Sequence, residues 1–465
     1  MKSQPKKEKE NHSNSWTLSL PFFFLFLLLT FIVKDNSIFW DNLLQASKTA
    51  HFYLENNFNQ LLVSPSIDAG HPPLFGIYLA LVFKVFGKSL AIAHFAMLPF
   101  LLGIVWQVVR LVTYFTSVHR FPILLLIFSN AVLLGQSSLV SADIVMLFFF
   151  LLALNGVLYL KKWQIIVGTI GLGWTSIRGI FSIAALVSIH LMHHKNIRLL
   201  WVFVPVLLSG LAYYGFHFLE RGWWLSTTSE NWSHHRGFVD SMGFIRNVAI
   251  LGWRLLDFGV IILWIVFAWL FFKDRSFLKE DKNRLLLFIP VFLLLCYAPA
   301  FLFFKNPIGH RYVLFFHIVF TVLIGVWLIQ SRFYKKWIIG LMVFIQLSGN
   351  FWVYPKKIAK GWDASLAHLP YHSLMTEMKT YINEQNLDYQ SIGTEFPNVG
   401  SRQFIELNNE LEGFPQKDFE KDNYILYSNV FNDFSDEQID ELENNWTIKK
   451  ELYRGQVCVI LYQKK

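Results

Sequence analysis

Long apolar stretches, separated by short polar connections, recur through the first 355 residues of this 465-residue chain. A helix needs about 20 apolar residues to cross the hydrocarbon core of a bilayer. We therefore predict a polytopic α-helical membrane protein with about 11 transmembrane helices, at residues 16–33, 91–114, 122–137, 144–160, 163–176, 179–192, 199–218, 247–272, 285–304, 311–329 and 337–354. The apolar segment 74–87 is short for a span and is predicted to be a juxtamembrane or re-entrant helix in the first large loop.

The basic residues between these stretches predict the orientation. If the spans alternate, the clusters of Lys and Arg all fall on one side of the membrane, at Lys2 to Lys9, His119-Arg120, Lys161-Lys162, Lys195 to Arg198, Lys273 to Arg284 and Arg332 to Lys336. The positive-inside rule makes that side cytoplasmic. The extracytoplasmic side then receives the C-terminal region and residues 34–90, 138–143, 177–178, 219–246 and 305–310. The first apolar run is expected to be retained as a helix, because no small-x-small cleavage site follows it.

The last part of the chain changes in character and is predicted to be a small soluble α/β domain. Two apolar runs typical of buried strands lie at residues 424–427 and 457–462. Ser435 and Gln438 have the spacing of a capping box, which predicts a helix that carries Ile439 and Leu442 on one face. The predicted organisation is a cytoplasmic tail, a transmembrane domain and an extracytoplasmic α/β domain, at residues 1–15, 16–355 and 356–465.

Composition supports this class. Hydrophobic residues make up 54% of the chain and charged residues 16%, against about 25% charged residues in typical soluble domains. The net charge of +9 is uneven: residues 356–465 carry 12 Lys and Arg against 18 Asp and Glu, and the rest carry 29 against 14. This basic excess lies in the clusters that set topology, so nucleic-acid binding is not indicated. The cysteines, Cys296 and Cys458, indicate neither a disulfide framework nor a zinc site.

Ionisable residues gather at the extracytoplasmic ends of the predicted spans. They are Asp41, His71, Asp143, Arg178, the run His234-His235-Arg236, and His310-Arg311 followed by Tyr312. An ionisable side chain at the bilayer centre costs about 3 kcal/mol, so such groups usually face a cavity in membrane proteins. Their concentration on one face predicts one shared site.

Each of these residues also has a purely structural interpretation. Asp41 could be a solvated loop residue, Asp143 could cap the following helix, and Arg178 could extend to the membrane interface. The histidines at 234–235 are more typical of a loop than of a metal site. The basic pair at 310–311 opens a predicted helix at its electropositive end, where a bound anion such as phosphate would account for it.

Together the residues suit a specific chemistry. Two carboxylates and two arginines at one membrane face are suited to transfer from a phosphate-linked donor. One carboxylate can act as general base on an acceptor hydroxyl or amine. The arginines, Arg178 and Arg311, can stabilise the charge that develops on a leaving phosphate.

Five short motifs follow one another along residues 16–355, in the order Asp41, Gly70-His71-Pro72-Pro73-Leu74 with Phe86-Gly87, Ser141-Ala142-Asp143, Ser176-Ile177-Arg178-Gly179 and Arg311-Tyr312. This order resembles the GT-C glycosyltransferase superfamily, and within it the branch of the protein O-mannosyltransferases and the lipid A aminoarabinose transferase. The resemblance implies a GT-C-like fold. It also implies transfer of a sugar, usually with inversion, from a polyprenyl-phosphate donor to an extracytoplasmic lipid, glycan or protein.

The resemblance further implies roles for individual residues. Asp41 resembles the catalytic acidic residue of the first loop and is expected to be the general base, with Asp143 as the second acidic residue. The residues expected to bind substrate are His71, Arg178, His310, Arg311 and Tyr312. His71 and Arg178 stand where relatives often have lysine, and His71 would carry a charge only part of the time near neutral pH. No cofactor is certain, and a divalent metal ion on Asp41 and Asp143 stays open.

Two other functions stay open: a polytopic transporter or lipid/oligosaccharide flippase, and an oligosaccharide ligase. Transporters tend to carry internal repeats and polar groups near the midplane, and this sequence displays neither. The expected partners are a polyprenyl-phosphate-linked sugar donor, membrane lipid and an extracytoplasmic acceptor, and no nucleic acid. The expected location is the bacterial inner membrane, with the site and the C-terminus facing the periplasm.

Overall fold

The computed structural model describes residues 4–225, 233–305, 308–355, 358, 360–431 and 433–465, without the side chains of residues 4–14 and His234. Its first part is helical, with α1 (Gln4–Val33), α2 (Thr49–Glu55), α3 (Leu74–Phe86), α4 (Leu90–Phe95), α5 (Leu98–Phe115), α6 (Arg120–Phe128), α7 (Ala131–Ser137), α8 (Ala142–Tyr159), α9 (Lys162–Thr175), α10 (Gly179–His194), α11 (Val204–Arg221), α12 (Ser241–Leu256), α13 (Ile261–Lys273), α14 (Asp281–Leu302), α15 (Leu314–Gln330) and α16 (Lys336–Ser348).

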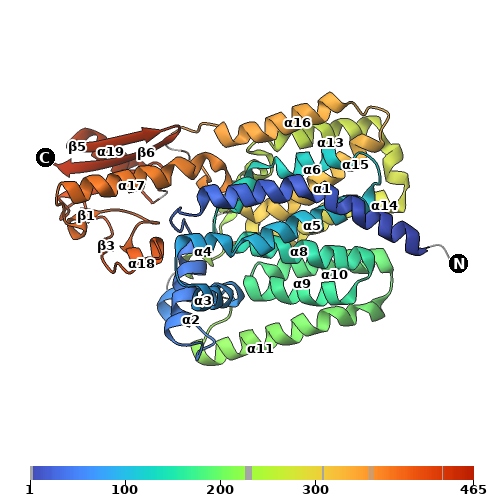
Figure 1. The fold of residues 1–465 in the computed structure, drawn as a ribbon, viewed down its shortest axis with the longest axis horizontal. Coiled ribbons are helices and arrows are strands. Elements are labelled where there is room, and N and C mark those ends of the chain that lie inside the picture. Colours follow the sequence, from blue (N-terminus) through green and yellow to red (C-terminus); the bar gives the residue numbers. More distant parts are fainter. Residues whose placement is uncertain (1–3, 226–232, 306–307, 356–357, 359, 432) are drawn as a thin grey trace.

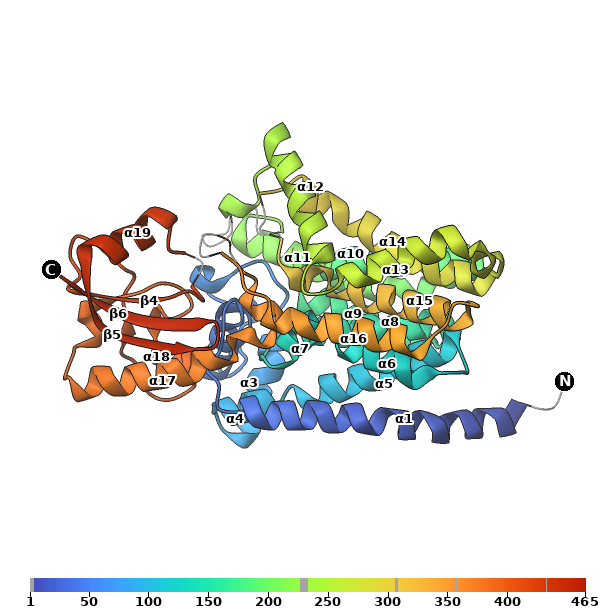
Figure 2. The ribbon, with the colours of Figure 1, turned by 90° about the horizontal axis from the view of Figure 1, so that it is seen from above.

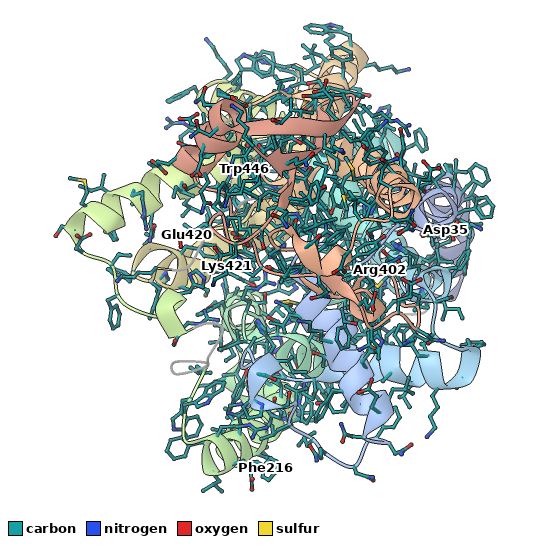
Figure 3. All side chains as sticks on the ribbon, turned by 90° about the vertical axis from the view of Figure 1, so that its left-hand side faces the viewer. Asp35, Phe216, Arg402, Glu420, Lys421 and Trp446 are labelled. Carbon is teal, nitrogen blue, oxygen red and sulfur yellow. The ribbon has the colours of Figure 1, made fainter. Side chains whose placement is uncertain are left out.

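Most of these helices run along the long axis of the molecule, and the C-terminal domain lies at one end of them (Figure 1). The N-terminus lies at the opposite end, and α12 stands away from the other helices (Figure 2). The span that contains α15 is 94% buried and therefore lies inside the bundle. Seen from the end of the C-terminal domain, Asp35 and Phe216 of the helical part lie toward the margin of the molecule (Figure 3).

The apolar stretches all become helices, but the predicted number of spans is not confirmed. Within the described residues, six helices are long and apolar enough to cross a membrane. Two more stretches are bent pairs, α6 with α7 at 64° and α12 with α13 at 88°, and counting each pair as one span gives eight. Asn130 caps the start of α7 by accepting the N–H of Leu133, and Gly259 adopts a φ of +82° between α12 and α13. A capping side chain and a left-handed glycine therefore break two stretches that the hydropathy pattern presents as continuous.

The first large loop is mostly helical. A π-helix at Leu43–Lys48 continues directly into α2, and α3 packs against α2. The helical segment begins at Asp41, whose backbone oxygen accepts the N–H of Gln45 at 3.0 Å. The close contact of α2 and α3 requires Gly76, because a Cβ there would lie 2.2 Å from Cγ2 of Thr49. The short helix predicted at 74–87 is thus present as α3.

The C-terminal domain contains a four-stranded sheet in the order β1-β4-β6-β5, with only the β1–β4 pair parallel. Its elements are α17 (Leu369–Glu384), β1 (Ile392–Gly393), β2 (Gly400–Ser401), α18 (Arg402–Ile405), β3 (Gly413–Phe414), β4 (Tyr424–Ser428), α19 (Asp436–Asn445), β5 (Trp446–Arg454) and β6 (Val457–Lys464). Both predicted strands are present, as β4 and β6. The capping box of Ser435 and Gln438 opens α19, and Leu442 is buried beneath it. Cys296 and Cys458 form no disulfide within the part of the chain that the structure describes.

Each part has its own hydrophobic core. Where the two parts meet, residues of each part pack into the core of the other. Phe39 and Leu139 of the helical part belong to the core of the C-terminal domain. Ala364, Ile405 and Leu407 of the C-terminal region belong to the core of the helical part. The domain is therefore docked on the loops and helix ends that carry the predicted site residues.

Candidate functional site

The guanidinium of Arg311 is the centre of the site. Arg311 lies on the 3-10 turn His310–Val313 that leads into α15, and its side chain is only 9% exposed. Its two terminal nitrogens donate to the carboxylates of Asp41 and Asp363. Its Nε lies 3.3 Å from Oδ2 of Asp143, an ion pair without hydrogen-bond alignment. Three carboxylates from distant parts of the chain thus share one cation.

Asp143 joins this group to a second arginine. Its Oδ1 forms an ion pair with Nη2 of Arg178 at 2.7 Å, so one carboxylate lies between two guanidinium groups. The alternative in which Asp143 caps α8 is wrong, because the cap is Ser141, whose hydroxyl oxygen accepts the N–H of Asp143 at 3.1 Å. The Asp143 carboxylate is thereby left for the two arginines.

His71 holds the turn that presents Arg178. Its Nδ1 lies 3.1 Å from the hydroxyl of Ser176 and accepts the backbone N–H of Ile177 at 3.4 Å. Burial, with Arg178 and two further arginines nearby, lowers the pKa of His71 to about 3. The partial charge expected near neutral pH is therefore wrong, and His71 acts as a neutral ring with Nδ1 as acceptor.

Tyr312 lies between cationic groups. The Arg178 guanidinium lies 4.2 Å from the Tyr312 ring centroid and that of Arg311 lies 5.1 Å from it, both in cation–π range. Arg236 also lies within electrostatic range of Tyr312 and Arg178. Burial lowers the pKa of Arg236, Tyr312 raises it and Arg178 lowers it further. The run that contains Arg236 thus reaches the site, although the side chain of His234 lies outside the described residues.

The third carboxylate, Asp363, has no sequence signal that distinguishes it. It lies on the short turn Trp362–Ala364 that follows the last apolar run. Nε2 of Gln136 donates to its backbone oxygen at 2.9 Å and to its carboxylate at 3.3 Å. Burial raises the pKa of the Asp363 carboxyl, and Arg311 opposes that shift. One acidic residue in an acidic domain could be singled out only once its position in space was known.

The structure does not bring His310 into this group. Its Nε2 lies 2.7 Å from Oδ2 of Asp257, and its ring lies 4.5 Å from that of Phe258. The hydroxyl of Tyr354 donates to the same Asp257 carboxylate. The neighbours His310 and Arg311 therefore belong to two separate polar groups, one on each side of a single turn.

The carboxylates as arranged do not fit a divalent metal ion. Asp41, Asp143 and Asp363 direct oxygen atoms at the nitrogens of Arg311, which supplies the positive charge between them. Among the residues that the structure describes, no group of three or more His, Cys, Asp or Glu has an arrangement suited to a metal. The metal ion considered from the sequence stays an untested prediction.

The fold of the chain can be compared with those of known proteins. No protein-family model matches the chain, and no curated protein matches its sequence. In structure, however, the chain is similar to the ArnT-like GT-C glycosyltransferases, so the resemblance noted from the motifs is confirmed for the fold.

One similar structure is that of ArnT from Cupriavidus metallidurans bound to undecaprenyl phosphate, with a TM-score of 0.51 and 10% identity over 95% of this chain and 97% of that one. A second is the apo state of the same protein, with a TM-score of 0.50 and 9% identity over 97% of this chain and 98% of that one.

Proposed function

We propose that the protein is a membrane glycosyltransferase that transfers a sugar from a polyprenyl-phosphate donor to an extracytoplasmic acceptor. The observation that carries this proposal is the convergence of Asp41 and Asp143 on Arg311, next to Arg178 and Tyr312. The fold supports it, because a solved structure of that fold holds undecaprenyl phosphate.

Arg178 and Arg236 are assigned to the donor phosphate. Arg311 is surrounded by three carboxylates, so its charge is already compensated inside the protein. Among the described residues, Arg178 forms an ion pair with Asp143, and its guanidinium lies over the Tyr312 ring. A preorganised cation of this kind stabilises charge that develops on a leaving group, because it needs no reorganisation during the reaction.

Asp41 is assigned as the general base. Its side chain is 23% exposed, compared with 9% for Asp143 and 8% for Asp363, so it is the carboxylate of the three that an acceptor can best reach. Asp41 would take the proton of an acceptor hydroxyl or amine. The acceptor atom bonds to the anomeric carbon from one face as the bond to the phosphate oxygen breaks on the other. The products are the inverted glycoside and polyprenyl phosphate, whose added charge Arg178 and Arg236 stabilise.

The orientation follows the charge pattern. The basic connections predicted for the cytoplasm leave Asp41, Asp143 and Arg311 on the extracytoplasmic side. In a bacterial cell this is the periplasmic face of the inner membrane, where a lipid-linked donor and a soluble or membrane-bound acceptor can meet.

The test is transfer from labelled polyprenyl-phosphate sugars by the purified protein in lipid vesicles, for wild type and Asp41→Asn. We expect kcat to fall by at least 100-fold in the variant, because the base is lost. Asp35→Asn is the matched control, since this acid lies in the same loop, its side chain is 77% exposed and its ion pair with Lys34 is long at 3.7 Å. Equal rates for wild type and Asp41→Asn would remove the assigned base.

The same assay separates the other functions. Movement of labelled lipid across the bilayer without a new glycosidic bond would identify a flippase. Transfer only from donors that carry a preassembled glycan would identify a ligase.

A further inference from the structure

The carboxylate of Asp363 reaches the site from beyond the last transmembrane stretch. It contacts Nη1 of Arg311, while Asp41 of the first loop and Asp143 of α8 occupy the other sides of the same guanidinium. Each of the three nitrogens of Arg311 therefore faces a different carboxylate. Asp363 alone among these partners comes from the C-terminal region.

We propose that Asp363 is a positioning residue that holds Arg311 between Asp41 and Asp143, so that the first turn of the C-terminal region completes the active site. The inference rests on the proposed function and adds a residue to it. Asp363 is not assigned contact with substrate, because Arg311 lies between it and the base.

The fold delivers Asp363 through a close backbone contact. At Gly135 of α7, a Cβ would lie 2.5 Å from the backbone nitrogen of Ser365 and 2.8 Å from the carbonyl carbon of Ala364. Only glycine lets the 362–365 turn approach α7 this closely. Gln136, the next residue of α7, then donates to both the backbone and the side chain of Asp363.

The charges around Asp363 explain why it matters to the position of Arg311. Besides Arg311 and the amide of Gln136, it faces the two other carboxylates of the site, and Arg254 of α12 lies within electrostatic range. Without Asp363, one terminal nitrogen of a nearly buried guanidinium loses its partner. Such a group moves toward its remaining partners, because an uncompensated buried charge is strongly unfavourable. The guanidinium would then bind the remaining two carboxylates more closely and hold Asp41 away from the acceptor.

The test compares steady-state transfer by wild type, Asp363→Asn and Asp363→Glu in vesicles. For Asp363→Asn we expect kcat to fall by about 10- to 100-fold, while KM for the lipid-linked donor stays within about twofold, because the arginines assigned to the phosphate are unchanged. Asp363→Glu restores the charge and is expected to recover part of kcat.

Gly135→Ala is a second variant that should disturb the contact between Asp363 and Arg311. It replaces no ionisable group but forces the 362–365 turn, and Asp363 with it, away from α7, so it should lower kcat with the same unchanged donor KM. Glu406→Gln is the matched control, since Glu406 is a partly buried carboxylate of the C-terminal domain that forms ion pairs with Lys379 and Arg402 and not with Arg311. It should keep the wild-type kcat.

The outcomes separate the inference from the function on which it rests. If wild type transfers sugar and Asp363→Asn does so at the same rate, the positioning role is overturned and the glycosyltransferase assignment stands. A rise in donor KM at unchanged kcat also overturns it, since Asp363 would then act in binding. If wild type transfers no sugar from any lipid-linked donor, the proposed function fails and the inference fails with it.

Discussion

Replacement of Arg178 by Gln tests whether this residue stabilises the leaving phosphate. The substitution removes the guanidinium that lies 2.7 Å from Asp143 and 4.2 Å from the Tyr312 ring centroid. Asp143 keeps its second partner, Nε of Arg311 at 3.3 Å. The variant should therefore fold, because no carboxylate of the site is left without a cation.

The magnitude follows from the contacts that are lost. A preorganised donor aimed at developing charge contributes about 2.7–4 kcal/mol to the transition state, which corresponds to a fall in kcat of about 100- to 1,000-fold. Because the Arg178 side chain is only 13% exposed, the lost cation–π contact with Tyr312 costs about 2 kcal/mol of folding stability, which is less than the about 5–15 kcal/mol that typically holds a domain folded. Arg178→Lys keeps the charge but not the planar fork, so its kcat should fall between those of wild type and Arg178→Gln.

The assay is single-turnover transfer from a saturating lipid-linked donor in vesicles, with thermal unfolding measured in parallel. Arg110→Gln is the matched control, because Arg110 is also a partly buried arginine stacked on a tyrosine, 5.0 Å from the Tyr159 ring centroid, but contacts none of the site residues. A rate for Arg178→Gln within threefold of wild type, at normal stability, would refute the phosphate role of Arg178.

Two further expectations follow from the site. His71 has a folded-state pKa of about 3, below its usual value of about 6.5, so the unfolded state binds more protons in between and folding stability falls as pH drops below about 6.5. His71→Gln should flatten this loss, as measured by thermal unfolding from pH 7 to pH 4, and an identical pH dependence would contradict a neutral buried His71. Chelation with EDTA should leave transfer unchanged, because Arg311 already supplies the positive charge between the three carboxylates. Activity that is lost on chelation and restored by a divalent cation would disprove this arrangement.

Short-range sequence patterns predict much of the fold. Apolar stretches near bilayer length become helices because backbone groups in hydrocarbon must be paired within their own segment. The capping box at Ser435 and the strands at 424–427 and 457–462 were equally readable, since capping and buried-strand patterns are encoded over a few residues. The hydropathy pattern does not predict the helix breaks at Asn130 and Gly259. Hydropathy is averaged over a window of residues, so one capping side chain or one left-handed residue does not change it.

The sequence predicts only part of the candidate site, because the remaining contacts also depend on tertiary structure. Asp41, Asp143, Arg178 and Arg311 stand out because a charged residue at the end of an apolar run is unusual, and the structure brings all four together. Asp363 lies in the acidic C-terminal region, where one more carboxylate is ordinary. His310 adjoins Arg311 in sequence, yet its ring pairs with Asp257 on the other side of the turn.

The sequence by itself determined that the chain is a membrane protein, which residues form its helices and which ionisable groups lie at one face, because hydrophobicity and charge act locally. The tertiary structure alone decided which of these groups touch, that burial lowers the pKa of His71 and that the C-terminal region supplies a third carboxylate. Those outcomes depend on side chains that approach from positions as far apart as Asp41 and Asp363. Ion pairs between residues so far apart in sequence depend on how the helices and loops pack, and no local sequence pattern predicts them.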